Sequence, residues 1–123
     1  MIIITGMVLA LVDDLMFRSK IKSTATPLGV AVTFAGSSGA ALTAMRAAPP
    51  SLVILDLNNP RTDPLGTIAA MKQDAALAAI PTIGYVSHVD VATIDAARVA
   101  GVGEVLARSA FTTQLPELLS RAG

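Results

Sequence analysis

The segment from Ser51 to Pro60 constrains the fold of this chain more than any other. Residues 52–55 are all apolar, Asp56 follows them, and the turn-forming sequence Asn-Asn-Pro begins two residues later. A short unbroken apolar run is typical of a strand that is buried on both faces, and such strands belong to parallel sheets covered by helices. Because ligands of open parallel sheets bind beyond the carboxyl ends of the strands, the position of Asp56 indicates a functional residue.

A second segment has the same pattern, because residues 7–12 are apolar and are followed by Asp13 and Asp14. The two strands together predict a cluster of Asp13, Asp14 and Asp56 at one edge of one sheet. Three carboxylates this close repel one another unless a cation joins them, and Mg²⁺ prefers such oxygen ligands. Asn58 lies two residues past Asp56, where its carbonyl oxygen is a further candidate ligand. A single aspartate at a strand end is more often a turn or helix cap, so the metal hypothesis rests on the joint pattern.

Strand-like and helix-like patterns alternate along the whole chain. Strands are predicted at residues 7–12, 30–35, 52–57, 81–87 and 104–107. Helices are predicted at residues 15–28, 40–48, 65–79 and 91–100, and a last helix opens at Thr112 or Thr113 and runs to about residue 121. This strict alternation predicts an α/β fold, namely a flavodoxin-like, doubly wound sheet of five parallel strands in the order 2-1-3-4-5, with helices on both faces in three layers. We expect a single domain over residues 1–123, with residues 1–6 as a candidate N-terminal extension.

Composition excludes several classes of function. Nine basic and nine acidic residues cancel, so we expect no nucleic-acid binding through bulk charge. The absence of cysteine excludes disulfides and thiolate catalysis, and a single histidine, His88, excludes a multi-histidine metal site. The apolar N-terminal run lacks the features of a signal peptide and ends at Asp13, well short of the roughly 20 residues that a membrane span needs. We therefore expect no membrane partner and a cytoplasmic location.

The acidic pair and Asp56 combine with three further positions into a recognisable pattern. Pro60 lies four residues after Asp56, Ser87 follows the fourth predicted strand, and Ala100-Gly101 precedes the fifth. With these motifs the chain resembles, over residues 7–121, the receiver domain of bacterial two-component response regulators. Each motif alone is weakly specific, and the combination is much more so.

The resemblance implies a phosphorylation site. Asp56 would accept a phosphoryl group from a histidine kinase or a phosphotransfer protein, and the Ser87 hydroxyl would contact a phosphoryl oxygen. An aspartyl carboxylate is a usable nucleophile, and Mg²⁺ neutralises charge on the transferring group. The residues that the resemblance implies for Mg²⁺ are Asp13, Asp14, Asp56 and Asn58.

The chain departs from the receiver pattern at the cationic position after the fifth strand. Receivers carry a lysine there, whereas counting from Ala100-Gly101 places Arg108 and counting back from Phe111-Thr112 places Ser109. Arginine is longer and planar, so it does not replace lysine geometrically. Arg108 is therefore either a contact of the phosphoryl group or a surface charge.

Two further departures lie beside this site. Val105 stands where receivers usually carry an aromatic switch residue, and His88 follows Ser87 where small residues are common. His88 either crowds the site or is a solvent-facing loop residue. We expect Asp56 to accept a phosphoryl group, with little change spreading to residues 104–121.

Three classes of function remain. The favoured one is a stand-alone response-regulator receiver in two-component signalling, which is a signalling domain and not an enzyme beyond self-catalysed phosphoryl transfer and dephosphorylation. The alternative is a pseudo-receiver that binds other proteins with weak or no phosphorylation. An unrelated flavodoxin-like enzyme or nucleotide binder is disfavoured, because no glycine-rich phosphate loop follows the first strand.

Two surfaces are candidates for partners. Arg18, Lys20 and Lys22 lie on the first predicted helix, which either helps to dock the kinase or is only a solvated face. Residues 91–121 carry few charges over their first helix, and they are a candidate surface for a homodimer or another partner.

Overall fold

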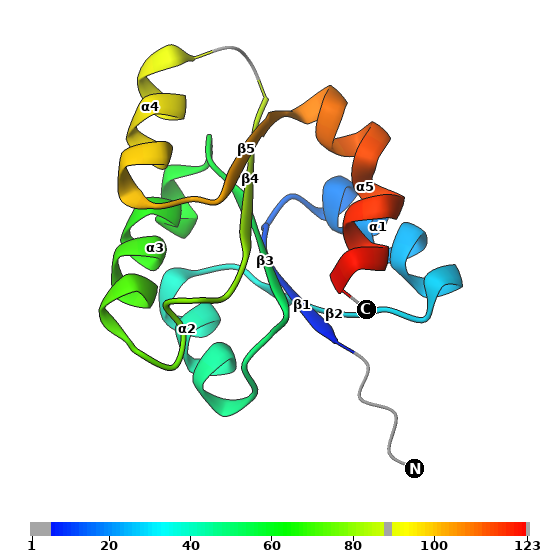
Figure 1. Ribbon diagram of the computed structural model, residues 1–123. Coiled ribbons are helices and arrows are strands. Elements are labelled where there is room, and N and C mark those ends of the chain that lie inside the picture. The colour runs from blue at the N-terminus through cyan, green and yellow to red at the C-terminus, as the bar shows by residue number, and fades with distance from the viewer. Residues whose placement is uncertain (1–5, 88–89, 123) are drawn as a thin grey trace.

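The computed structural model describes residues 6–87 and 90–122 and shows a parallel sheet between two layers of helices (Figure 1). Its strands are β1 (Met7–Leu11), β2 (Ala31–Ala35), β3 (Leu52–Asp56), β4 (Thr82–Val86) and β5 (Glu104–Ala107). The order is β2-β1-β3-β4-β5, and every neighbouring pair is parallel. The predicted flavodoxin-like fold is therefore confirmed.

The helices divide between the two faces of the sheet (Figure 1). One face is covered by α1 (Leu15–Ala25) and α5 (Arg108–Ala122). The other is covered by α2 (Ser38–Ala47), α3 (Pro64–Gln73) and α4 (Val91–Ala100). Two short 3₁₀ helices, η1 (Thr26–Leu28) and η2 (Pro60–Thr62), follow α1 and β3. Within residues 6–87 and 90–122, no helix is both long and apolar enough to span a membrane.

The central strand β1 explains why its sequence is an unbroken apolar run. Successive side chains of a strand point to opposite faces, so Val8 and Ala10 join the core beneath α1 and α5. Leu9 and Leu11 join the second core, beneath α2, α3 and α4. Strand β3 divides its side chains in the same way. β2 lies at one edge of the sheet, as its alternating sequence predicts, and β5 lies at the other.

The prediction for the start of the last helix was wrong. α5 begins at Arg108, directly after β5, and not at Thr112 or Thr113. The hydroxyl of Thr112 donates to the carbonyl of Arg108 at 2.9 Å, and that of Thr113 donates to the carbonyl of Ser109 at 3.1 Å. These threonines therefore bond back one turn within the helix, where the sequence predicted its start.

Two other helices are shorter than predicted. α1 ends at Ala25, and the 3₁₀ helix η1, which contains Pro27, replaces its last predicted turn. α3 ends at Gln73 because Asp74 has an extended backbone. The Asp74 carboxylate accepts from the N–H of Ala76, and its carbonyl accepts from the N–H of Leu77. These bonds favour a turn over a continued helix.

Gly84 in β4 packs against the side chain of Leu57, just past the end of β3. A Cβ atom at Gly84 would lie 2.6 Å from Cδ1 and 2.8 Å from Cγ of Leu57, the residue that follows Asp56. We expect Gly84→Ala to lower the free energy of unfolding by about 1–3 kcal/mol, because the added methyl group overpacks the core. Chemical denaturation measures this loss. The control is Gly39→Ala in α2, where a Cβ atom meets nothing within 4 Å. Equal losses in the two variants would contradict the overpacking explanation.

Candidate functional site

The carboxyl ends of β1, β3 and β4 open into a cavity of about 390 Å³. Its lining residues are Asp13, Asp14, Asp56, Asn58, Asn59, Arg61, Ser87 and Arg108. This set contains all six residues that the sequence predicts for the site, together with Asn59 and Arg61, which the sequence did not single out. The six arrive from three strand ends, the loop after β3 and the start of α5. Their roles in phosphoryl transfer stay predictions.

Asp56 lines the cavity and is half-buried. Burial raises the pKa of its carboxyl group above the ordinary value, and the nearby charges of Asp13 and Asp14 add to this effect. The N–H of Asn58, which donates to Asp56 Oδ1 at 3.1 Å, and the charge of Arg108 act in the opposite direction. The ionised carboxylate is thus held where a further positive charge would stabilise it.

Asp13 has a hydrogen-bonding partner on each carboxylate oxygen. Its Oδ1 accepts from Asn59 Nδ2 at 2.5 Å, and its Oδ2 lies 3.1 Å from a guanidinium nitrogen of Arg61. A metal ion that used Asp13 would have to share a carboxylate oxygen with one of these partners or replace it. The site therefore already holds positive charge from its own chain beside Asp13.

Asp14 also has a structural task. Its Oδ1 accepts from the N–H of Phe17 at 3.0 Å and caps the N-terminus of α1. Across residues 6–87 and 90–122, no three acidic or histidine side chains come together as a ready group of metal ligands. The donor chemistry still fits a hard divalent cation, because Asp13, Asp14, Asp56 and Asn58 offer only oxygen ligands around one cavity.

Asn58 joins the ends of β3 and β4. Its side-chain oxygen accepts a short hydrogen bond from the N–H of Ser87, while its own N–H donates to Asp56. The side chain therefore holds the loop after β3 against the residue that carries the candidate hydroxyl. The part of its backbone carbonyl as a metal ligand stays a prediction.

Arg108 lies between the cavity and a cluster of aromatic rings. Its guanidinium carbon is 4.9 Å from the centroid of the Phe17 ring, a cation–π distance. Beneath it, the centroids of Phe17 and Tyr85 are 4.8 Å apart, and those of Tyr85 and Phe111 are 4.9 Å apart. Arg108 thus packs on an aromatic platform while it also lines the cavity.

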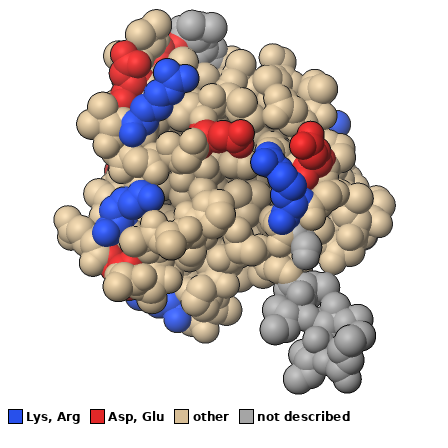
Figure 2. All heavy atoms as spheres, viewed as in Figure 1, with Lys and Arg blue, Asp and Glu red and all other residues tan. Residues whose placement is uncertain are grey.

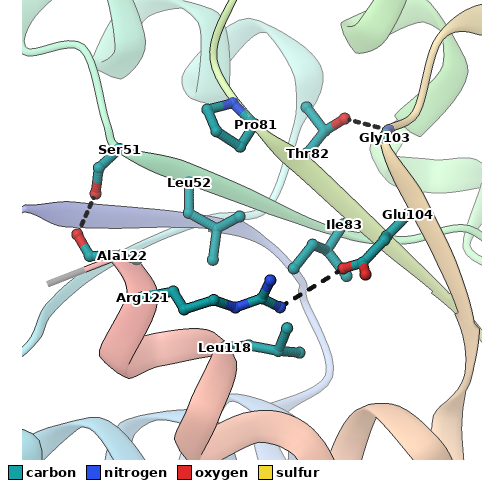
Figure 3. A pocket seen from close by; sticks show the side chains of 10 residues that line it. All are labelled: Ser51, Leu52, Pro81, Thr82, Ile83, Gly103, Glu104, Leu118, Arg121 and Ala122. Atoms are coloured by element: carbon teal, nitrogen blue, oxygen red, sulfur yellow. Dashed lines mark hydrogen bonds and ion pairs between the residues drawn. The ribbon is translucent and has the colours of Figure 1, made fainter.

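A second cavity, of about 330 Å³, lies at the opposite ends of the strands (Figure 3). Leu52, Ile83 and Leu118 give it an apolar floor, and an ion pair of 3.8 Å between Arg121 and Glu104 lies at its side. None of the predicted site residues lines it. The cavity lined by Asp13, Asp14 and Asp56, here called the acidic cavity, is therefore the only one of these two that carries the predicted chemistry.

The likeness of this chain to known proteins lies in its fold. No protein-family model matches the sequence, and no curated protein sequence matches it. Among solved structures, the phosphorylated cyanobacterial phytochrome response regulator RcpA aligns with a TM-score of 0.81 and 20% identity over 96% of this chain and 91% of its own. The chemotaxis response regulator CheY4 of Vibrio cholerae aligns with a TM-score of 0.83 and 19% identity over 98% of this chain and 100% of its own. The Mn²⁺-bound response regulator Rcp1 aligns with a TM-score of 0.77 and 18% identity over 94% and 90% of the two chains.

This chain has the fold of response regulator receiver domains. The structure distinguishes the two candidates for the predicted cationic position after the fifth strand. Arg108 lines the acidic cavity, whereas Ser109 does not. Val105, which the sequence predicts at the position of an aromatic residue in receivers, is half-buried against the core beneath α2, α3 and α4. The aromatic platform of this receiver fold is therefore on the other face, beneath α1 and α5.

Not all the candidate docking residues on α1 are free. Arg18 donates through Nε to the carbonyl of Val12, and its guanidinium stacks over Phe34 at 5.5 Å. Arg18 thus serves packing, and only Lys20 and Lys22 of the predicted basic set are exposed. His88 lies outside the described residues.

Charged side chains of both signs are mixed on the face seen in Figure 2. On the face drawn in Figure 2, basic side chains lie close to acidic ones and much of the surface is uncharged. Named ion pairs join Arg46 to Asp74 at 3.3 Å and Arg121 to Glu104 at 3.8 Å. This face therefore has no broad basic patch.

Sequence reasoning missed Asn59 and Arg61, although a signal was present. Both lie in the same loop as Asn58, within five residues of Asp56 at the end of a buried strand. Polar residues in such loops often reach the site. Phe17 and Tyr85 gave no comparable signal, because aromatic residues within helical or strand-like patterns are ordinary core residues.

Proposed function

We propose that this protein is a phospho-accepting receiver of two-component signalling. The observation that carries the proposal is the placing of Asp56 in one cavity with two further carboxylates, a hydroxyl and a guanidinium. Receiver chemistry uses these kinds of group together, and the fold is that of receivers. The phosphorylated state named for RcpA supports the same chemistry here.

The proposed reaction is an in-line transfer to Asp56. A carboxylate oxygen of Asp56 attacks the phosphorus atom of a phosphohistidine, on a histidine kinase or a phosphotransfer protein. The P–O bond to Asp56 forms as the P–N bond breaks, and the imidazole leaves with the bonding electrons and takes up a proton. Asp56 then carries an acyl phosphate, which water hydrolyses to end the signal.

The remaining residues prepare the cavity for this transfer. Asp13, Asp14, Asp56 and the Asn58 carbonyl would hold Mg²⁺, which when bound supplies charge neutralisation for the phosphoryl oxygens. The Mn²⁺-bound form of Rcp1 supports a divalent cation at such a site. Ser87 donates its hydroxyl to one phosphoryl oxygen. Asn58 keeps Ser87 in place through its side-chain hydrogen bond.

Arg108 supplies the second anchor for the phosphoryl group. It lines the cavity from the start of α5, and a charge-assisted contact with a phosphoryl oxygen would draw it from its place over Phe17. Val105 has no aromatic ring that a movement of Ser87 could rearrange. When a phosphoryl mimic binds, we therefore expect the changes in NMR amide chemical shifts to concentrate around the cavity and Phe17, with little change across β5.

Partners would approach two surfaces of the domain. Leu15 and Met16 are 77% and 86% exposed at the start of α1, directly after Asp14, so an apolar rim borders the cavity where a phosphodonor would dock. Val91 and Val99 are 65% and 89% exposed on α4. They support the 91–121 surface as a site for a homodimer or an output partner.

A pseudo-receiver is the second candidate, and one observation favours it. Both carboxylate oxygens of Asp13 are engaged by Asn59 and Arg61. If these contacts persisted in solution against Mg²⁺, the cavity would be a structural polar network and the domain would act by binding other proteins alone.

Labelling of the unmodified protein separates the two candidates. Acetyl phosphate with millimolar Mg²⁺ is expected to add one phosphoryl group, seen as an increase in intact mass, and peptide mapping should locate it on Asp56. Chelation of the divalent cation should suppress the reaction. A mass that stays unchanged over a full range of acetyl phosphate concentrations would favour the pseudo-receiver.

A further inference from the structure

Arg61 is held beside the acidic cavity by a short, well-connected loop. Its N–H donates to Asn59 Oδ1 at 3.0 Å, at the start of η2. The next residue, Thr62, is fully buried, and its hydroxyl donates to the carbonyl of Asn59 at 3.2 Å. The backbone at Arg61 is therefore anchored, although its side chain is 79% exposed.

The Asn59 amide connects this loop to Asp13. Its oxygen accepts from the Arg61 N–H while its nitrogen donates to Asp13 Oδ1. The Arg61 guanidinium contacts the other oxygen, Oδ2, at 3.1 Å. One loop thus supplies both partners of Asp13, a neutral amide and a full positive charge.

We propose that Arg61 competes with the divalent cation for Asp13 and thereby sets the affinity of the site for that cation. The inference rests on the proposed function, because it assumes that the cation uses Asp13. A guanidinium has no lone pair with which to share a metal, and its charge repels a divalent ion. A cation that binds Asp13 Oδ2 therefore displaces Arg61, and one that binds Oδ1 is repelled by the guanidinium beside it.

The competition is weakened by the exposure of its cationic side, since the side chains of Arg61 and Asp13 are 79% and 24% exposed. Exposed ion pairs are weak and are screened by salt, so Arg61 lowers the affinity without blocking the site. When it is displaced, its anchored backbone keeps the guanidinium near the cavity mouth, ready to return when the cation leaves. The negative charge around Asp13 is therefore partly neutralised by the cation when it is bound and by Arg61 when it is not.

The test is a Mg²⁺ titration by isothermal calorimetry at low ionic strength, without a phosphodonor. Arg61→Ala is expected to bind Mg²⁺ about fivefold more tightly than the unmodified protein, the upper range for removing an exposed ion pair. The difference should shrink in high salt. Equal or weaker binding by Arg61→Ala would overturn the proposal, as would the absence of Mg²⁺ binding in both proteins.

Arg46→Ala is the matched control. It removes the same charge and breaks an exposed ion pair of 3.3 Å with Asp74, and neither residue lines the cavity. Its Mg²⁺ affinity should equal that of the unmodified protein, and an equal gain would assign the effect to net charge and overturn the proposal. The proposed function fails separately: a fivefold difference in a protein that acetyl phosphate does not label would support the role of Arg61 and reject phosphorylation.

Discussion

Replacement of Asp56 with asparagine is expected to abolish phosphoryl labelling and to raise the thermal stability of the protein. Asparagine keeps the shape of the side chain but has no carboxylate to attack phosphorus, so no acyl phosphate forms. Burial raises the pKa of Asp56, which means that its ionised form opposes folding at neutral pH. Intact mass after acetyl phosphate treatment and a thermal melt measure the two effects.

The stability difference between these proteins should depend on pH. The folded protein keeps the Asp56 proton to a higher pH than the unfolded chain, whose pKa is near 3.8. Stability of the unmodified protein therefore falls as pH rises from about 3.8 through the folded pKa. The Tm advantage of Asp56→Asn should be absent below this window and complete above it. A variant that lost both labelling and Tm would indicate a damaged fold and not a missing nucleophile.

Replacement of Phe111 with alanine is expected to cause the largest loss of stability. Phe111 is fully buried, and its ring centroid lies 4.9 Å from that of Tyr85 and 5.9 Å from that of Phe17. Truncating a buried phenylalanine costs about 3–5 kcal/mol, because it leaves a cavity and loses ring contacts. For a domain of this size the Tm should fall by roughly 10–20 °C. Denaturant titration and melting curves measure the change.

Phe34 provides the comparison for Phe111. It is half-buried on the edge strand β2, and its ring contact is with the Arg18 guanidinium. Phe34→Ala should therefore cost clearly less than Phe111→Ala. Similar losses would show that the three-ring cluster is no more important than an ordinary partly buried aromatic contact.

The fold could be predicted because its two central strands are buried on both faces. Such strands need apolar residues at every position, so β1 and β3 stand out from the rest of the sequence, and their adjacency follows from the strand order. The same order brings Asp13, Asp14 and Asp56 together at the carboxyl ends of these two strands. The placing of Arg108 at the cavity could also be anticipated by counting from Gly101, although a second count left Ser109 open.

What could not be predicted depends on contacts between residues distant in sequence. Asn59 and Arg61 lie 46 and 48 positions after Asp13. Only the folded structure shows that they contact both carboxylate oxygens of Asp13. The ring cluster joins α1, β4 and α5. Helix ends were misplaced where a threonine or aspartate has two local hydrogen-bonding options, since tertiary packing decides between them.

The aromatic platform also gives this protein an optical probe of its own. The chain has no tryptophan and one tyrosine, so emission excited at wavelengths longer than those phenylalanine absorbs comes from Tyr85 alone. Tyr85 pairs in register with Asp56 across β3 and β4, and burial keeps the pKa of its phenol above the ordinary value. Its emission therefore reports one protonation state of one ring, beside the residue whose charge would change on phosphorylation. Events at the cavity can be followed by fluorescence without an attached dye.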